Sequence, residues 1–454
     1  MKVDLLLENC RLVTFEGEIL EACIAVEQGK IAALSKLGER FQADRRLNVE
    51  GKLVLPGVID CHVHFRDPGK TFKEDFATGS AAAAVGGVTT VFDMPNTNPP
   101  TTSLSALKAK IEAAREKSLV DYAFWGGLSE DNLEEAERLA EGGVIGFKVS
   151  ASRRELEEEA GVFTVPRRTE TILALMEAAG RLPLGFHCED YGFRVFLKGK
   201  FEGKGLDALQ VYHRLIPGEA EASAAGRVLA AASLTGHPIH LVHVSSRATL
   251  GVVHWWRSLG VKVTVETCPH YLLLTREHVE KLGGEAKINP PLKGKEDLEA
   301  LWEALNRGEV DVVASDHSPH TPEEKADFAQ APPGFCGVET LLPLLLTQAL
   351  EGRLPLRRLV EVLCWKPAEA FGLWRVKGSL QPGFDADLVV VDTGREWTIR
   401  REKLHSKSKV TPWDGWKVKG FPVLTMVRGE TVAENGEPVG KPGWGRMVKP
   451  WRSR

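Results

Sequence analysis

Leu53–His64 reads LVLPGVIDCHVH, an apolar segment that ends in two histidines separated by one residue. A short apolar run of this kind is typical of a strand that is buried on both faces of a parallel sheet. Alternate side chains of a strand point to the same face, so His62 and His64 are expected to face one way. Two histidines at the end of a strand can supply half of a divalent metal site.

Apolar segments of strand length recur through the middle of the chain, and amphipathic helical segments separate them. Alternation of strand and helix indicates a parallel sheet, and about eight such units fit a TIM (β/α)8 barrel. We therefore predict an α/β fold in which residues 56–375 form a barrel that carries the metal-dependent hydrolase site. The predicted strands after the first lie at 89–94, 122–126, 144–149, 184–188, 240–244, 262–267 and 310–315.

The two ends of the chain have a different pattern, with short strand-like runs and no long amphipathic helix. Such runs lie at 5–7, 11–14, 24–27 and 31–34, and they return at 386–392 and 423–428. We predict that residues 1–55 and 376–454 together build one small β-sandwich domain beside the barrel. The glycine- and proline-rich tail from about residue 436 is expected to lie on the surface.

Composition indicates the general class of the protein. The 454 residues are 43% hydrophobic and 26% charged, as in a globular protein with a large core. A net charge of −4 gives no indication of nucleic-acid or membrane binding. Acidic residues interrupt the short apolar stretch at the N-terminus, so neither a signal peptide nor a transmembrane helix is expected there. Seven cysteines without a CxxC motif predict reduced thiols and a cytoplasmic location.

Further polar residues end other apolar strands and would complete the metal site. Lys148 interrupts the run VIGFKV at 144–149, where an unpaired ammonium is costly, although a strand-end lysine can also extend to solvent. His187 and His243 could each be an ordinary buried histidine. Their order on successive strands favours a metal site, because the active sites of TIM barrels lie at the C-terminal ends of the strands. The candidate ligands are His62, His64, Lys148, His187, His243 and Asp316.

Several neighbours of these candidates are predicted to be structural. Cys61 and Cys188 adjoin candidate ligands, but strand alternation turns their side chains to the opposite face. His317 follows Asp316 and is expected to support the site from behind, and His270 could do the same.

With these motifs together, the chain resembles the cyclic amidohydrolases of the dihydroorotase, hydantoinase and allantoinase group over nearly its full length. In that group, the two histidines of the HxH motif and two further histidines bind two zinc ions, which a carbamylated lysine bridges. The resemblance implies two Zn²⁺ per subunit, bridged by carbamylated Lys148, with Asp316 both a ligand and the catalytic general base and acid. A hydroxide between two divalent ions would attack the ring amide. Manganese or cobalt would also suit these ligands.

Residues around the candidate metal site bear on which cyclic amide is the substrate. Dihydroorotate carries a ring carboxylate, and Arg66, two residues after His64, has the planar guanidinium that suits a carboxylate. Asn96 in MPNT and His320 in SDHSPH add possible donors. These three residues resemble the set with which dihydroorotases hold the carboxylate, and Asn289 in NPPL resembles part of a ring-binding loop. Taken singly, Arg66 could be a surface ion-pair residue, Asn96 a turn residue and His320 a loop histidine.

The resemblance therefore implies a dihydroorotase of the class I type, which converts (S)-dihydroorotate reversibly to N-carbamoyl-L-aspartate in pyrimidine biosynthesis. An allantoinase or a hydantoinase/dihydropyrimidinase is the alternative enzyme, because GFK at 146–148 and ETCPHY at 266–271 fit allantoinases equally well. A non-catalytic scaffold is disfavoured because no candidate ligand is missing. The resemblance also suggests a homodimer or homotetramer that could associate with aspartate transcarbamoylase.

Overall fold

The segment Leu53–His64 contributes to two different sheets of the protein, whose computed structural model describes residues 1–13, 18–36, 38–150, 152–153 and 164–451. β5 (Leu53–Pro56) belongs to a sheet built from both chain ends, whereas β6 (Val58–Val63) begins a parallel sheet. Every residue of both strands is buried. Gly57 separates them, and a Cβ atom at this position would clash with the side chain of Thr89, so the close approach requires glycine.

The parallel sheet is an eight-stranded barrel whose strands follow one another in chain order. A parallel bridge between Val63 and His317 joins its two ends, where the His64 amide donates to the His317 carbonyl at 2.8 Å. The predicted TIM barrel is thereby confirmed. After β6, its strands are β7 (Val88–Asp93), β8 (Asp121–Leu128), β9 (Gly146–Val149), β10 (Leu184–Phe186), β11 (Ile239–Leu241), β12 (Val263–Thr267) and β13 (Val312–Val313).

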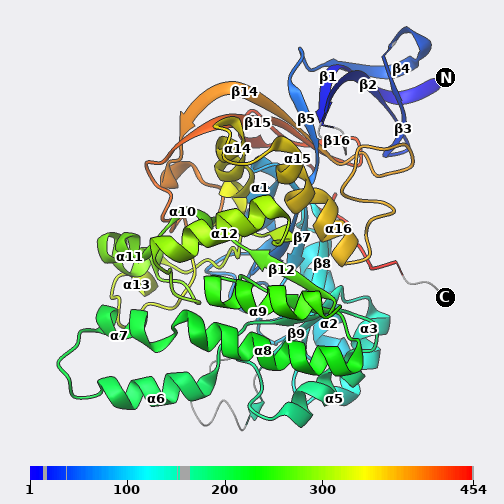
Figure 1. The fold of residues 1–454 in the computed structure, drawn as a ribbon. Coiled ribbons are helices and arrows are strands. Elements are labelled where there is room, and N and C mark those ends of the chain that lie inside the picture. The colour runs from blue at the N-terminus through cyan, green and yellow to red at the C-terminus, as the bar shows by residue number, and fades with distance from the viewer. Residues whose placement is uncertain (14–17, 37, 151, 154–163, 452–454) are drawn as a thin grey trace.

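Helices surround this barrel, as Figure 1 shows. Several begin at a side chain that accepts a backbone N–H of the first turn, such as Asp75 before α1 and Ser103 before α2. None of the helices among the described residues combines the length and the apolar character needed to cross a membrane. The helices that follow the strands are α1 (Phe76–Val85), α2 (Leu104–Arg115), α3 (Ala136–Gly142), α5 (Thr169–Ala179), α8 (Gly218–Thr235), α9 (Arg247–Ser258), α12 (Lys295–Arg307) and α14 (Leu341–Leu350).

Shorter helices lie in the connections between these elements. α6 (Tyr191–Phe201) and α7 (Ala208–Leu215) extend from the lower left of the molecule in Figure 1. A π-helical turn at Glu361–Trp365 joins α15 to α16. The remaining short helices are α10 (Pro269–Leu273), α11 (Arg276–Leu282), α13 (Pro322–Lys325), α15 (Leu356–Val360) and α16 (Lys366–Ala370).

Both ends of the chain build the second sheet, as predicted, and it crosses the top of the view in Figure 1. Its nine strands form one sheet in the order β17-β16-β15-β14-β5-β1-β2-β3, and β4 pairs with β1. The two short strands predicted at 5–7 and 11–14 are parts of one strand, because the pairing with β2 shifts between Leu7 and Cys10 without ending. Besides β5, the strands are β1 (Lys2–Val13), β2 (Ile19–Glu27), β3 (Lys30–Ser35), β4 (Gln42–Asn48), β14 (Leu388–Thr398), β15 (Lys417–Val427), β16 (Glu430–Glu434) and β17 (Glu437–Pro438).

A buried ion cluster ties this sheet to the amino end of the barrel. Lys377 Nζ lies 2.5 Å from Asp121, the first residue of β8, and 2.5 Å from Asp387, just before β14. Arg428, which follows β15, pairs with the other oxygen of Asp121. The division of the chain into residues 1–55, 56–375 and 376–454 stays a prediction. The ion cluster lies between the last two of these segments and fixes one against the other.

Candidate metal and substrate site

All six candidate metal ligands lie at the C-terminal ends of barrel strands. His62 is in β6 and His64 directly follows it, while Lys148 is in β9. The other three come just after β10, β11 and β13; they are His187, His243 and Asp316. Parallel strands of a barrel bring their carboxyl ends to one rim, which explains why residues 254 positions apart meet there (316 − 62). All are buried except His187, which is partly exposed.

His62, His64 and Asp316 form one group of converging ligand atoms. Asp316 Oδ1 lies 3.2 Å from His62 Nε2 and 3.4 Å from His64 Nε2. The second ring nitrogen of each histidine meets a protein oxygen: His62 Nδ1 is 2.7 Å from Glu266 Oε1, and His64 Nδ1 is 2.6 Å from Asn96 Oδ1. Metal-binding histidines usually have their outer nitrogen held in this way. The three residues therefore fit a divalent metal ion.

His187 and His243 form a second group next to the first. His187 Nδ1 lies 2.9 Å from His243 Nε2, and the ring of His243 is centred 5.5 Å from that of His62. His243 Nδ1 is buried and has no hydrogen-bond partner among the described residues. Burial, followed by the charges of His187 and Lys148, holds the pKa of His243 well below its ordinary value. A neutral imidazole with an unshared nitrogen is the form that binds a metal ion.

Lys148 is a buried cation whose charge acts on both groups, since it lowers the pKa of His243 and opposes protonation of His62. Its side chain is buried in the strand, and this burial lowers its pKa to about 8. The carboxylates of Glu266 and Asp316 oppose this shift. A minor fraction of Lys148 is therefore the neutral amine near neutral pH, and this is the form that can react with CO2 to give a carbamate.

Glu266 is a central residue of the site that the sequence analysis did not assign. Its Oε1 lies 2.7 Å from His62 Nδ1 and accepts the backbone N–H of His243 at 3.0 Å. Its Oε2 lies 2.9 Å from His240 Nε2 and accepts the Cys61 thiol at 3.4 Å. Burial alone would raise the pKa of the Glu266 carboxyl, but His62 and His240 hold it below its usual range. The signal in the sequence was a carboxylate inside the buried strand VTVET, as unusual there as Lys148 in its own strand.

The backbone is strained at three residues of the site. Arg66, His243 and Asp316 have φ angles of 62°, 39° and 47°, a region that residues other than glycine rarely adopt. Each lies where the chain has just left a barrel strand. Conformations of this kind cluster at functional sites, because the surrounding structure holds them in order to aim a side chain.

The candidate substrate residues do not all share the same contacts. Arg66 Nη2 donates to Ser318 Oγ at 2.6 Å and lies 3.2 Å from His320 Nε2, and both Arg66 and His320 are buried. Asn96 contacts the metal group instead, because its Oδ1 faces His64. Asn289 Oδ1 has no hydrogen-bond partner among the described residues. Arg66 and His320 thus come together, as a shared carboxylate site requires.

His317 and His270, the two histidines that were expected to support the site, are both buried. His317 Nδ1 accepts the backbone N–H of Gly337 at 3.1 Å, while its Nε2 lies 3.4 Å from Glu74. His270 lies against Tyr271 and Phe335, and burial lowers its pKa to about 4. These contacts agree with supporting positions for both.

A model of the amidohydrolase family matches residues 53–432. The chain belongs to the amidohydrolase family. It is 38% identical to a dihydroorotase of Methanosarcina acetivorans, over 98% of this chain and 95% of that one. It is also 38% identical to an allantoinase of Rubrobacter xylanophilus, over 99% and 98% of the two chains.

A solved structure extends the comparison to the whole fold of this amidohydrolase. The L-hydantoinase (dihydropyrimidinase) from Arthrobacter aurescens superimposes with a TM-score of 0.92, at 36% identity, over 98% of this chain and 100% of that one. Three relatives with three different activities are thus almost equally similar to the chain. Overall similarity confirms an amidohydrolase, and individual site residues have to distinguish the substrates.

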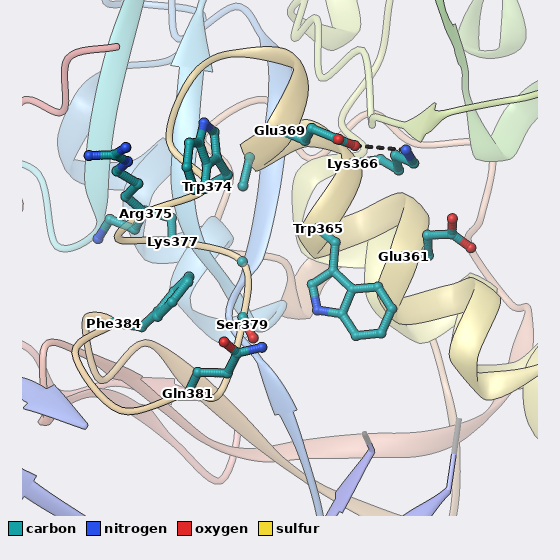
Figure 2. A pocket seen from close by; sticks show the side chains of 12 residues that line it. Glu361, Trp365, Lys366, Glu369, Trp374, Arg375, Lys377, Ser379, Gln381 and Phe384 are labelled. Carbon is teal, nitrogen blue, oxygen red and sulfur yellow. Dashed lines mark hydrogen bonds and ion pairs between the residues drawn. The ribbon is translucent and has the colours of Figure 1, made fainter. Parts of the chain in front are cut away.

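Figure 2 shows residues that line a large cavity of this amidohydrolase. It has a volume of about 890 Å³, and its lining includes Trp365, Trp374 and Phe384. Lys377, which contacts the first residue of β8, also lines it, so the cavity opens near the amino ends of the strands. None of the candidate ligands or substrate residues lines it.

Proposed function

We propose that this amidohydrolase is a zinc-dependent dihydroorotase, which opens the ring amide of (S)-dihydroorotate to give N-carbamoyl-L-aspartate and catalyses the reverse closure in pyrimidine biosynthesis. The supporting observation is the buried pair of Arg66 and His320, whose nitrogens lie 3.2 Å apart beside Ser318. A guanidinium and an imidazole can together bind a carboxylate. Dihydroorotate has a carboxylate on its ring, whereas allantoin and hydantoin have none.

His62 and His64 would hold one zinc ion and His187 and His243 a second, with Lys148 as the bridging carbamate and Asp316 beside both. The lowered pKa of Lys148, about 8 because of burial, supports the carbamate. Two bound divalent ions would supply a water molecule of lowered pKa and would polarise the scissile carbonyl group.

The protein's own groups would move the proton and hold the substrate. Although burial opposes ionisation, His62 and His64 lower the pKa of Asp316, which keeps its carboxylate charged. Asp316 can therefore accept a proton from the attacking water and return it to the amide nitrogen that leaves. Arg66 and His320 would hold the ring carboxylate, and the amide group of Asn96 could add a donor because its Oδ1 already faces His64. Asn289 would contact the ring through its loop.

The family resemblance also supports a homodimer or homotetramer, and the seven cysteines without a CxxC motif support a cytoplasmic location. Association with aspartate transcarbamoylase is a further candidate, to be tested by co-purification with that enzyme.

The test compares ring opening of L-dihydroorotate, allantoin and hydantoin by the zinc-loaded protein, together with an Arg66→Ala variant. We expect dihydroorotate to be preferred. Losing hydrogen bonds to a charged group costs about 1.5–3 kcal/mol, so Arg66→Ala should lower kcat/KM for dihydroorotate by about 10- to 100-fold or more. The metal content should stay the same. Arg307→Ala, which removes an exposed cation of α12, is the matched control.

Two results would overturn the proposal. Faster turnover of allantoin or hydantoin would assign the enzyme to one of those activities and remove the substrate roles of Arg66, Asn96 and His320. Absence of turnover of all three substrates by protein that has bound metal would favour a non-catalytic scaffold.

A further inference from the structure

His320 lies between two cationic side chains. Its Nε2 is 3.2 Å from Arg66 Nη2, and its Nδ1 is 3.1 Å from Lys73 Nζ. Lys73 is only 8% exposed, and it lies in the connection between β6 and α1. Its ammonium also lies 2.6 Å from Glu324 Oε1, which holds the side chain in position.

Because of this arrangement, His320 can accept a hydrogen bond from only one of its two cationic neighbours. Burial, followed by the charges of Arg66 and Lys73, lowers the pKa of His320 to about 2, so the ring is neutral near pH 7. A neutral imidazole has one N–H donor and one acceptor nitrogen, whereas guanidinium and ammonium groups only donate. Only one of the two contacts can therefore be a hydrogen bond, and the other brings two N–H groups together.

When no anion is bound, Glu324 allows the tautomer of His320 that carries the proton on Nδ1. Its Oε2 lies 3.4 Å from His320 Nδ1, so an Nδ1–H group can face it while Arg66 donates to Nε2. An anion beside Arg66 would favour the other tautomer, with the proton on Nε2. Arg66 would then donate to the anion, and an N–H group on His320 Nε2 could donate to it as well.

We propose that Lys73 is a positioning residue for the ring carboxylate, because it donates to His320 Nδ1 and so places the ring proton on Nε2 when the anion binds. His320 and Arg66 then both donate to the carboxylate. The ring proton leaves Nδ1 for solvent and another is taken up at Nε2, without net uptake or release. This inference rests on the proposed function, and it explains how the site would select a ring that carries a carboxylate.

The first experiment reads the position of the proton directly. The zinc-loaded protein, with ¹⁵N-labelled histidine, is titrated with orotate, a planar ring that carries the carboxylate, and with uracil, the same ring without it. His320→Gln assigns the resonances. We expect orotate, and not uracil, to move the proton from Nδ1 to Nε2. In Lys73→Met the proton should stay on Nδ1 beside Glu324. The same tautomer in both proteins with orotate bound would overturn the proposal.

The second experiment separates positioning from a structural role. Lys73→Met should raise KM for L-dihydroorotate by about 10- to 100-fold with little change in kcat, because a charge-assisted hydrogen bond is lost on binding. Turnover of dihydrouracil, which lacks the carboxylate, should not change, and Lys73→Arg should recover part of the loss. Lys108→Met, on the exposed face of α2, is the control. Equal losses on both substrates would overturn the proposal.

The two experiments also distinguish this inference from the proposed function. If wild-type protein opens neither ring but orotate still moves the proton of His320, the anion site stands and the dihydroorotase assignment falls. If dihydroorotate is hydrolysed normally by Lys73→Met, the assignment stands and the role of Lys73 falls.

Discussion

Replacing Glu266 by glutamine tests how the candidate metal site is held. The carboxylate is fully buried, and its Oε1 contacts His62 at 2.7 Å and the His243 backbone at 3.0 Å. Glutamine can keep one oxygen at these two contacts, but its NH2 group then faces His240 Nε2, and the negative charge is lost. The outer nitrogen of His62 would meet a neutral amide, which leaves its Nε2 less basic and its ring less firmly oriented.

The expected loss follows from these contacts. The two contacts of Oε1 become neutral, and His240 and the Cys61 thiol lose the acceptor that Oε2 provides. Of these four contacts, the one with His62 acts on a candidate ligand, and weakening it corresponds to about 1.5–3 kcal/mol. This is about a 10- to 100-fold weaker affinity for zinc, and changes of that size are typical when the carboxylate behind a ligand histidine is removed.

Zinc affinity is measured by competition with a chromophoric chelator, and bound metal is counted by elemental analysis. Glu221→Gln is the matched control, because Glu221 is an equally buried carboxylate whose partners are the backbone and hydroxyl of Ser245 rather than a histidine. Circular dichroism monitors folding in each variant. If folded Glu266→Gln binds zinc as tightly as the wild type, Glu266 does not control His62. If Glu221→Gln loses zinc equally, the effect is a general one of burial.

Two further predictions concern buried lysines. Burial lowers the pKa of Lys148 to about 8, and only the neutral amine reacts with CO2, so zinc uptake by stripped protein with bicarbonate should rise with pH through about 8. Uptake that is constant between about pH 6 and pH 9, or a Lys148→Arg variant that still binds two metal ions, would contradict this. Lys377→Met leaves Asp387 without its cation and should lower the free energy of unfolding by about 3–5 kcal/mol in urea titrations. Lys366→Met, which removes an exposed ion pair, is its control, and equal stability of the two variants would refute the predicted role.

The sequence by itself determined the barrel and the set of candidate ligands. Apolar runs alternating with amphipathic helices permit a parallel sheet, and a barrel of parallel strands brings their carboxyl ends to one rim. Candidate ligands such as His62 and Asp316 could therefore be grouped because each ends a strand, without knowledge of any contact. The candidate substrate residues Arg66 and His320 could be selected for the same reason, since each follows a candidate ligand closely.

Only the tertiary structure decided which side chains stand behind these residues. Glu266 and Lys73 are charged residues whose importance depends on burial against partners more than 200 positions away (266 − 62 and 320 − 73 residues). The order of the strands within the sheet of the two chain ends, and the turn of Asn96 toward His64, were likewise set by contacts between distant segments. Local patterns show that a residue is charged and where its strand ends. Whether that charge meets water, a metal ligand or another charge is decided by packing, because the cost of burying it depends on the partner that it finds.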